Sequence, residues 1–131
     1  MKRLLFLLTL AAAAHAAPPA SFWTALHQVE TSGRLGAIVG DGGRSLGPLQ
    51  ISRAYFADSK VAGSYEQVIE LDSAIKVASA YMRRYEPEAW RQGNVEILAR
   101  LHNAGPSWRR KLAATDAYAA KVQREMRKLL P

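Results

Sequence analysis

The sequence predicts a predominantly helical α+β fold with one small β-hairpin. Beyond about residue 20, apolar residues recur at helical spacing, as in "FWTALHQVE", where Phe22, Leu26 and Val29 share one face. One segment breaks this period: "RLGAIVGDGGRSLGPLQIS" contains five glycines and only short apolar runs, which is the pattern of a hairpin. The chain has no cysteine, so this fold cannot depend on disulfides.

The chain begins with the pattern of a secretory signal peptide. "MKRLLFLLTLAAAAHAAPPA" has a basic start at Lys2 and Arg3, an apolar run, and small residues around "AHA". We therefore expect residues 1–16 to be removed before Ala17, and the protein to be exported to a periplasm or secreted. The apolar run is shorter than the ~20 residues that a membrane span needs, so no anchor is expected after cleavage. Residues 17–131 are long enough for a single domain with one core.

Net charge favours an anionic partner without identifying it. The 18 Lys and Arg against 11 Asp and Glu give a formal charge of +7, which falls to +5 when Lys2 and Arg3 leave with the signal peptide. Bacterial cell wall, lipopolysaccharide and extracellular nucleic acid are all anionic, and a merely solvated basic face is an equal alternative. The basic runs "WRRK" and "KVQREMRKLL" match no nucleic-acid-binding motif. We expect no nucleic-acid partner, and a monomer.

Helices and turns are expected in a definite order. The first helix spans about 21–32, with Ser21 as its N-cap and Gly33 as its stop. Strands over 37–39 and 44–46 form the hairpin. Ser52 is expected to cap the next helix, and a capping box of Ser64 and Gln67 the one after it. Three more helices are expected: one capped by Asp72 and ended by Pro87, one over 94–104, and one from Thr115.

Two carboxylates are the strongest candidates for chemistry. The chain shows no Cys/His metal cluster, no phosphate-binding glycine loop and no G-x-S-x-G motif, so we expect neither a metal nor a cofactor. Glu30 lies in the last turn of its helix beside the apolar stripe, where partial desolvation and the helix dipole both favour its protonated form. Asp41 lies in a glycine turn near Arg44 and should stay ionised. Carboxylates with such different surroundings suit glycosidic bond cleavage, although a solvated Glu and a turn-forming Asp would give the same pattern.

Three short segments in order carry a family resemblance: "VETSG" with Glu30, "GPLQI" with Gln50, and "ARLHNAGP" with His102 and Asn103. They resemble landmarks of the lysozyme and lytic transglycosylase superfamily. Together with "GDGGRSLGPLQISRAYFAD", "AYMRRY" and "YAAKV", they are more narrowly similar to the invertebrate-type (destabilase-like) lysozymes, over residues 29–122.

This resemblance implies a lysozyme-like fold with Glu30 as the acid and Asp41 as its partner. The sequence also departs from the family. Animal members are rich in disulfides and this chain has none, "ETSG" is one residue longer than the usual E-S-G, Leu49 replaces a common aromatic residue, and Ala104 replaces a usual glycine. The chain is therefore expected to be a cysteine-free, bacterial-style relative whose sugar-binding positions differ.

Five further residues are expected to contact the sugar. Gln50 and Asn103 would offer amide hydrogen bonds, or would instead tie the hairpin to a helix. Ser45 could bind the substrate or the aspartate, or be a plain strand hydroxyl. Tyr55 could form an aromatic wall for a sugar ring. His102 could contact the substrate or cap its helix end. Packing or structural roles are expected for Trp23, Trp90, Trp108, Phe56 and His27.

The predicted function is that of a muramidase, which hydrolyses the β-1,4 link between N-acetylmuramic acid and N-acetylglucosamine in peptidoglycan. Three alternatives remain open at this stage. A lytic transglycosylase would use Glu30 alone, and a catalytically silent module would only bind the cell wall. An isopeptidase is a weaker possibility, because the spacing shows no Ser/Lys dyad.

Overall fold

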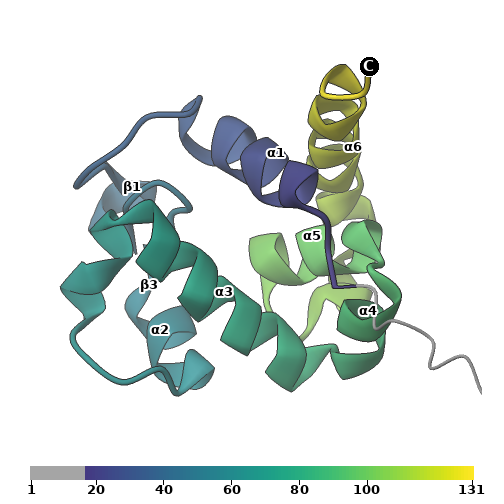
Figure 1. Ribbon diagram of the computed structural model, residues 1–131. Helices are drawn as coiled ribbons and strands as arrows, with labels where there is room; N and C mark the ends of the chain where they lie inside the picture. The colour runs from purple at the N-terminus through teal and green to yellow at the C-terminus, as the bar shows by residue number, and fades with distance from the viewer. Residues whose placement is uncertain (1–16) are drawn as a thin grey trace, which may run out of the picture.

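The computed structural model describes residues 17–131, so the predicted signal peptide lies outside the described residues. Helices dominate this part of the chain (Figure 1). In chain order the elements are α1 (Ala20–Thr31), β1 (Val39–Gly40), the 3-10 turn η1 (Asp41–Gly43), β2 (Ser45–Leu46), β3 (Ile51–Ser52), α2 (Arg53–Ser59), η2 (Tyr65–Ile69), α3 (Leu71–Tyr85), α4 (Pro87–Gln92), α5 (Val95–Ala104), η3 (Trp108–Lys111) and α6 (Leu112–Lys128).

The helices gather around a core that α3 spans from end to end. In Figure 1, α3 runs from the β region on one side to α4 on the other, and α6 stands beside α5. α6 packs against both α1 and α5, while α2 packs against α3. The fully buried core side chains come mainly from α1, α3, α5 and α6, and from β3 with the turn before it; the largest are Phe22, Leu26, Leu49, Ile51, Met82, Leu98 and Leu101.

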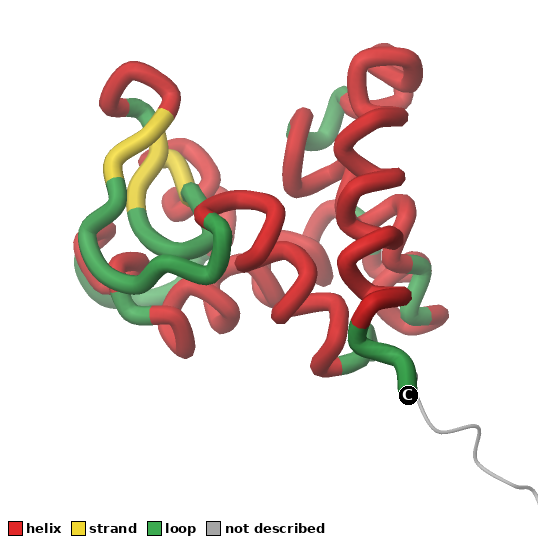
Figure 2. The backbone as a smooth tube through the Cα atoms, turned by 90° about the horizontal axis from the view of Figure 1, so that it is seen from above, coloured by secondary structure: helices red, strands yellow, loops and turns green. Residues whose placement is uncertain are grey.

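The three strands form one small antiparallel sheet in the order β1-β2-β3. Figure 2 shows them together at one end of the molecule, apart from α5 and α6. The cross-strand pairs are Val39 with Leu46 and Gly40 with Ser45, then Ser45 with Ser52 and Leu46 with Ile51. The predicted hairpin is confirmed, with its first strand shifted toward Asp41, and β3 adds a strand that the sequence pattern did not reveal.

One predicted helix cap is confirmed, and the structure adds a second cap that was not predicted. The Ser52 hydroxyl accepts a hydrogen bond from the Tyr55 backbone N–H at 3.1 Å, and Asn94 Oδ1 accepts one from Ile97 at 3.2 Å. Both side chains therefore satisfy a backbone donor in the first turn of a helix, but only the Ser52 cap was predicted from the sequence.

Other helix boundaries differ from the prediction. The Ser64–Gln67 capping box is wrong: η2 starts without a side-chain cap, and the Gln67 amide instead donates to the Ala62 carbonyl at 2.9 Å. Asp72 lies within the first turn of α3 and does not cap it. Pro87 follows the end of α3 as expected, but also begins α4 at a position where its missing N–H costs nothing. α1 begins at Ala20 and α6 at Leu112, before the expected Ser21 and Thr115.

The expected packing roles of the tryptophans agree with the structure. Trp108 is 6% exposed, and its indole N–H donates to Glu86 Oε1 at 2.9 Å. Trp23 and Trp90 pack against each other at the edge of the core. Over residues 17–131, none of the helices has both the length and the apolar character that crossing a bilayer requires.

Candidate active site

A polar pocket of ≈ 210 Å³ lies between the end of α1, the hairpin and the end of α5. Six of the seven residues predicted for the site line it: Glu30, Asp41, Ser45, Gln50, His102 and Asn103. Three segments that are distant in the sequence thus supply one cavity, with a carboxylate from the helix and another from the hairpin.

Glu30 is held by a tyrosine from the last helix. It lies half-buried in the last turn of α1, and its Oε1 accepts a hydrogen bond of 2.6 Å from the Tyr118 hydroxyl. Burial, and then the nearby Glu30 carboxylate, raise the pKa of Tyr118 well above its usual 10.0. Tyr118 therefore stays protonated and donates to Oε1 of Glu30, while Oε2 is not part of this hydrogen bond.

The ends of α1 and α5 form one wall of the pocket, the helix wall, and the hairpin forms the other, the hairpin wall. His102 links the two. Its Nε2 lies 3.0 Å from the Leu49 carbonyl oxygen and its Nδ1 lies 2.9 Å from the Tyr55 hydroxyl. A carbonyl can only accept, so Nε2 carries the proton and Nδ1 of the neutral ring accepts from Tyr55. Burial lowers the pKa of His102 below its usual 6.5, against the opposing influence of Glu30 and the Leu49 carbonyl. With both nitrogens occupied, His102 positions Leu49 and neither caps its helix nor leaves a nitrogen for the substrate.

Tyr55 does not form the aromatic wall that the sequence suggested. Its side chain is 8% exposed and stacks on Tyr81, with ring centroids 3.6 Å apart. It does not line the pocket, because the apolar core takes its ring and His102 takes its hydroxyl. Tyr55 therefore supports the site from behind.

Gln50 lines the pocket and also has a structural role, but it bonds within the hairpin region and does not tie the hairpin to a helix as expected. Its Nε2 donates to the Ile38 carbonyl at 3.0 Å and to the Gly47 carbonyl at 2.9 Å. A Cβ on Gly40 would overlap its Oε1, so a larger residue there would have to displace the Gln50 side chain. The amide therefore fixes the loop that leads into the sheet, and this contact explains why Gly40 lacks a side chain.

Asp41, unlike Glu30, lies on an exposed turn. It has φ +50°, a left-handed conformation that Asp tolerates better than most residues. Its side chain is 63% exposed, and its Oδ1 accepts a hydrogen bond of 3.2 Å from Arg44 Nη2. The half-buried Ser45 and the exposed Asn103 complete the rim of the pocket. Asp41 is thus placed by its turn and by one surface cation.

Tyr118 is the site residue that sequence reasoning missed. No role in the site was predicted for it, only a place in the helix expected from Thr115. A signal was present, because a tyrosine hydroxyl in an apolar stripe usually needs a hydrogen-bond partner. Nothing in the local sequence identifies that partner, since Glu30 lies 88 residues earlier in the chain.

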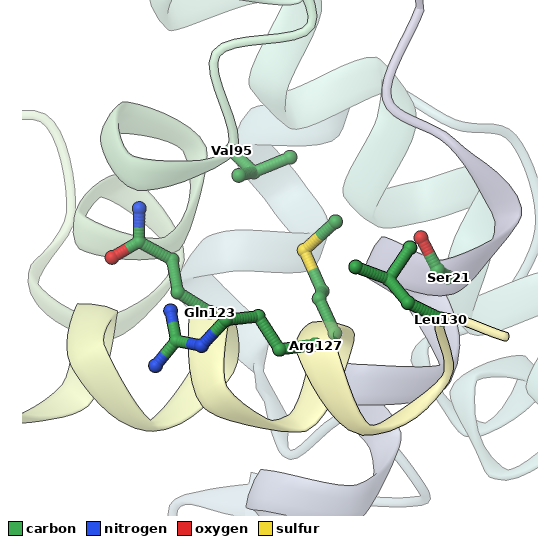
Figure 3. A pocket seen from close by; sticks show the side chains of 6 residues that line it. Ser21, Val95, Gln123, Arg127 and Leu130 are labelled. Atoms are coloured by element: carbon green, nitrogen blue, oxygen red, sulfur yellow. The ribbon is translucent and has the colours of Figure 1, made fainter.

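Another hollow, larger and more apolar, lies between α1, α5 and α6. This groove of ≈ 280 Å³ is lined by Ser21, Val95, Gln123, Met126, Arg127 and Leu130. Figure 3 shows the side chains of Val95 and Leu130 facing the same space, with Gln123 and Arg127 beside them. Its lining contains no carboxylate or imidazole, so it offers no acid or base. Among residues 17–131, no three His, Asp or Glu side chains come together as a metal site would require.

Comparison with known proteins gives structural matches only. No family model and no curated protein matches the sequence. One matching chain belongs to the crystal structure of Aeromonas hydrophila PliI in complex with Meretrix lusoria lysozyme. It is 26% identical with a TM-score of 0.68, and the match covers 82% of this chain and 89% of that one. The crystal structure of Tapes japonica lysozyme matches with 24% identity and a TM-score of 0.63, over 87% of this chain and 94% of the other. The protein thus has a lysozyme-like α+β fold, and its resemblance to the invertebrate-type (destabilase-like) lysozymes is confirmed at the level of the fold.

Proposed function

We propose that the protein is a muramidase that hydrolyses the β-1,4 link between N-acetylmuramic acid and N-acetylglucosamine in peptidoglycan. The observation that carries this proposal is the single polar pocket that brings Glu30 and Asp41 together from two separate walls. Hydrolysis of a glycosidic bond commonly uses two such carboxyl groups, one on either side of the scissile bond. The lysozymes among its structural neighbours support the same substrate class.

Glu30 is the general acid in this mechanism and then the general base. Its Oε2 would carry the proton to the leaving oxygen, because Oε1 is taken by the Tyr118 hydroxyl. That hydrogen bond strengthens as the carboxylate becomes charged, so it stabilises Glu30 after the proton has left. Tyr118 also fixes the rotamer of Glu30, and positioning of this kind is a large part of catalysis.

Asp41 is the nucleophile, or the group that stabilises the oxocarbenium-like centre. Retention of configuration follows if the two carboxyl groups act about 5 Å apart. Ser45 and Asn103 line the same pocket and would hydrogen-bond sugar hydroxyl or N-acetyl groups. Gln50 and His102 would hold the hairpin wall at the right distance from Glu30.

A lytic transglycosylase is the second candidate, and one observation favours it. Asp41 is 63% exposed and paired with Arg44, whereas Glu30 is anchored from the protein interior. Chemistry that uses a single glutamate and ends in an anhydro sugar would need Glu30 and would not need Asp41.

The proposal extends to the setting of the enzyme. Residues 17–131 would act as one catalytic domain and as a monomer, after export directed by residues 1–16. The formal charge of +5 on that part of the chain suits an anionic wall polymer.

Clearing of a suspension of purified bacterial cell walls tests this function. The native protein should clear it, and Glu30→Gln should not, because an amide cannot supply the proton. Glu88→Gln is a matched control, since Glu88 is an exposed glutamate on α4 far along the chain from the pocket. If the native protein clears nothing while binding walls, or if Glu30→Gln clears them equally well, the enzyme proposal fails and a wall-binding module takes its place.

A further inference from the structure

A second pocket, of ≈ 340 Å³, adjoins the hairpin and is lined by Gly43, Arg44, Ser52, Arg53 and Ala54. We call it the cationic pocket, because two arginines and no acid line it. None of its lining residues lines the candidate active site, and the proposed mechanism gives Arg53 no role.

The sheet connects the cationic pocket directly to the candidate active site. Ser45 lines the active-site pocket and Ser52 lines the cationic pocket, and the two residues are direct cross-strand partners. Opposed residues of an antiparallel pair lie on the same face of the sheet, about 4.8 Å apart in the hydrogen-bonding direction. The two pockets therefore adjoin along β2 and β3.

Arg53 is oriented but keeps its hydrogen-bond donors. Its guanidinium lies over the ring of Tyr65, 4.6 Å from the centroid. The Tyr65 hydroxyl donates to the Ile51 carbonyl, which fixes that ring against β3. Arg53 forms a long, exposed ion pair with Glu66, whose Oε1 lies 3.7 Å from Nη2, farther than a hydrogen bond. The arginine side chain is 76% exposed, so its planar fork can still receive a carboxylate.

Arg44 supplies a second positive charge on the same surface. Its Nε and Nη2 bond to the Asp41 backbone oxygen and carboxylate. Arg44 thus adds to the local positive potential, while Arg53 is the one that can bind a ligand in a bidentate manner.

We propose that the cationic pocket binds the carboxylates of the peptide stems carried by muramic acid, an inference that rests on the proposed function. A guanidinium fork matches a carboxylate, and peptide stems are attached to the same polymer that would fill the neighbouring pocket. Chitin is a neutral polymer of N-acetylglucosamine and offers Arg53 no such group. The pocket therefore selects peptide-bearing peptidoglycan over chitin.

Kinetics on matched substrates test this selection. The substrates are soluble peptidoglycan strands freed of teichoic acid, and the same strands with their carboxylates converted to methylamides. Arg53→Gln should raise KM on the unmodified strands by about three- to tenfold, the range between an exposed ion pair and a charged hydrogen bond. It should leave kcat nearly unchanged and have no effect on the amidated strands. Arg53→Lys keeps the charge but loses the planar fork, so its KM should lie between those of the native protein and Arg53→Gln.

Arg110→Gln is the matched control, because Arg110 is an exposed arginine of η3 outside both pockets. Equal behaviour of Arg53→Gln and Arg110→Gln on the unmodified strands would overturn the inference, as would an equal KM of the native protein for unmodified and amidated strands. Thermal melting of both variants verifies that they are folded.

Binding measurements separate this inference from the proposed hydrolysis. Labelled strands are titrated with Glu30→Gln and with Glu30→Gln/Arg53→Gln, and fluorescence polarisation is recorded. Weaker binding of the double variant to unmodified strands alone supports the cationic pocket even if the native protein cleaves nothing. Equal binding by the two variants overturns it, whatever the enzyme does.

Discussion

Glu30 and Asp41 line one pocket from opposite walls, yet the structure holds them in different ways. Glu30 is half-buried in a helix and receives the Tyr118 hydroxyl from a helix 88 residues further along the chain. Asp41 lies exposed in a turn of positive φ, and its side chain contacts Arg44, three residues away. One carboxylate is placed by tertiary contacts and the other by local ones.

This difference predicts unequal contributions of the two carboxylates to the proposed catalysis. A group fixed by the core loses little entropy when substrate binds, which suits the residue that must deliver a proton accurately. A group on a surface turn is partly screened by water until substrate covers it, so its electrostatic contribution depends on the bound sugar. The helix wall should therefore dominate catalysis, and the hairpin wall should adjust it.

The largest effect is expected from a direct comparison of the two carboxylates. Glu30→Gln should lower kcat by about 10²- to 10⁴-fold, the usual contribution of a general acid. Asp41→Asn should lower it less, by about 10- to 10²-fold, because its charge is partly screened. Turnover of soluble peptidoglycan strands measures both, with Arg44→Gln as the control for the ion pair. Near-normal turnover of Asp41→Asn would remove the two-carboxylate mechanism.

The hairpin wall can be broken without touching either carboxylate. In Gly40→Ala the new Cβ would overlap Gln50 Oε1, and such overpacking costs about 1–3 kcal/mol. Gly40 has an extended φ of −137°, so the cost is steric and not conformational. We expect a lower free energy of unfolding in urea and a large loss of lysis.

Gly43→Ala is the matched control for this variant. Gly43 has φ +91° but open space around its Cα, so its alanine variant tests strain alone. The role of Gln50 as the tie of the hairpin would be refuted by a Gly40→Ala protein as stable and as active as the native one.

Removing the Tyr118 hydroxyl sharpens the picture of the helix wall. Tyr118→Phe keeps the ring in place and deletes the donor to Glu30, so kcat should fall about tenfold with KM nearly unchanged. Tyr85→Phe removes a hydroxyl outside the pocket lining and should have no effect on kcat. A loss of stability with unchanged kcat in Tyr118→Phe would mean that this tyrosine only packs.

A smaller, pH-dependent effect is expected from His102, which joins the two walls. Its pKa in the folded protein is below the usual 6.5 because it is buried, so below pH 6.5 the unfolded chain binds the proton more readily than the folded one. Stability should therefore be fully present above pH 6.5 and decline as the pH falls below it. His102→Gln removes this titration, so its melting temperature should change less than that of the native protein between pH 7.5 and pH 5.5. Equal pH dependence of the two proteins would show that His102 does not link folding to protonation.

Much of this architecture could be predicted from local sequence. Helical spacing predicted α1, α3 and α5, and the glycine-rich segment predicted the hairpin. Ser52 was found as a cap because a cap bonds within its own turn. Six of the seven predicted site residues line one pocket, because short motifs mark them in the sequence. Their roles in catalysis and sugar binding stay predictions.

The rest depended on contacts that no local pattern encodes. β3 is two residues long, too short for an alternating pattern to show. Tyr55 is an aromatic residue of the kind that stacks on sugar rings, and only its stacking on Tyr81 in the structure reveals that it is buried. The pairing of Tyr118 with Glu30 and of His102 with Leu49 joins distant segments. Ser64 and Gln67 match a capping-box pattern, but the Gln67 side-chain amide donates to the Ala62 carbonyl instead.

Digestion of peptidoglycan in heavy-oxygen water, followed by mass spectrometry of the products, tests the central claim most directly. If Glu30 and Asp41 carry out hydrolysis, each new muramic acid end will be reducing and will contain one heavy oxygen, and Glu30→Gln will release no such product. Anhydro sugars that are lighter by one water and contain no heavy oxygen would contradict two-carboxylate hydrolysis.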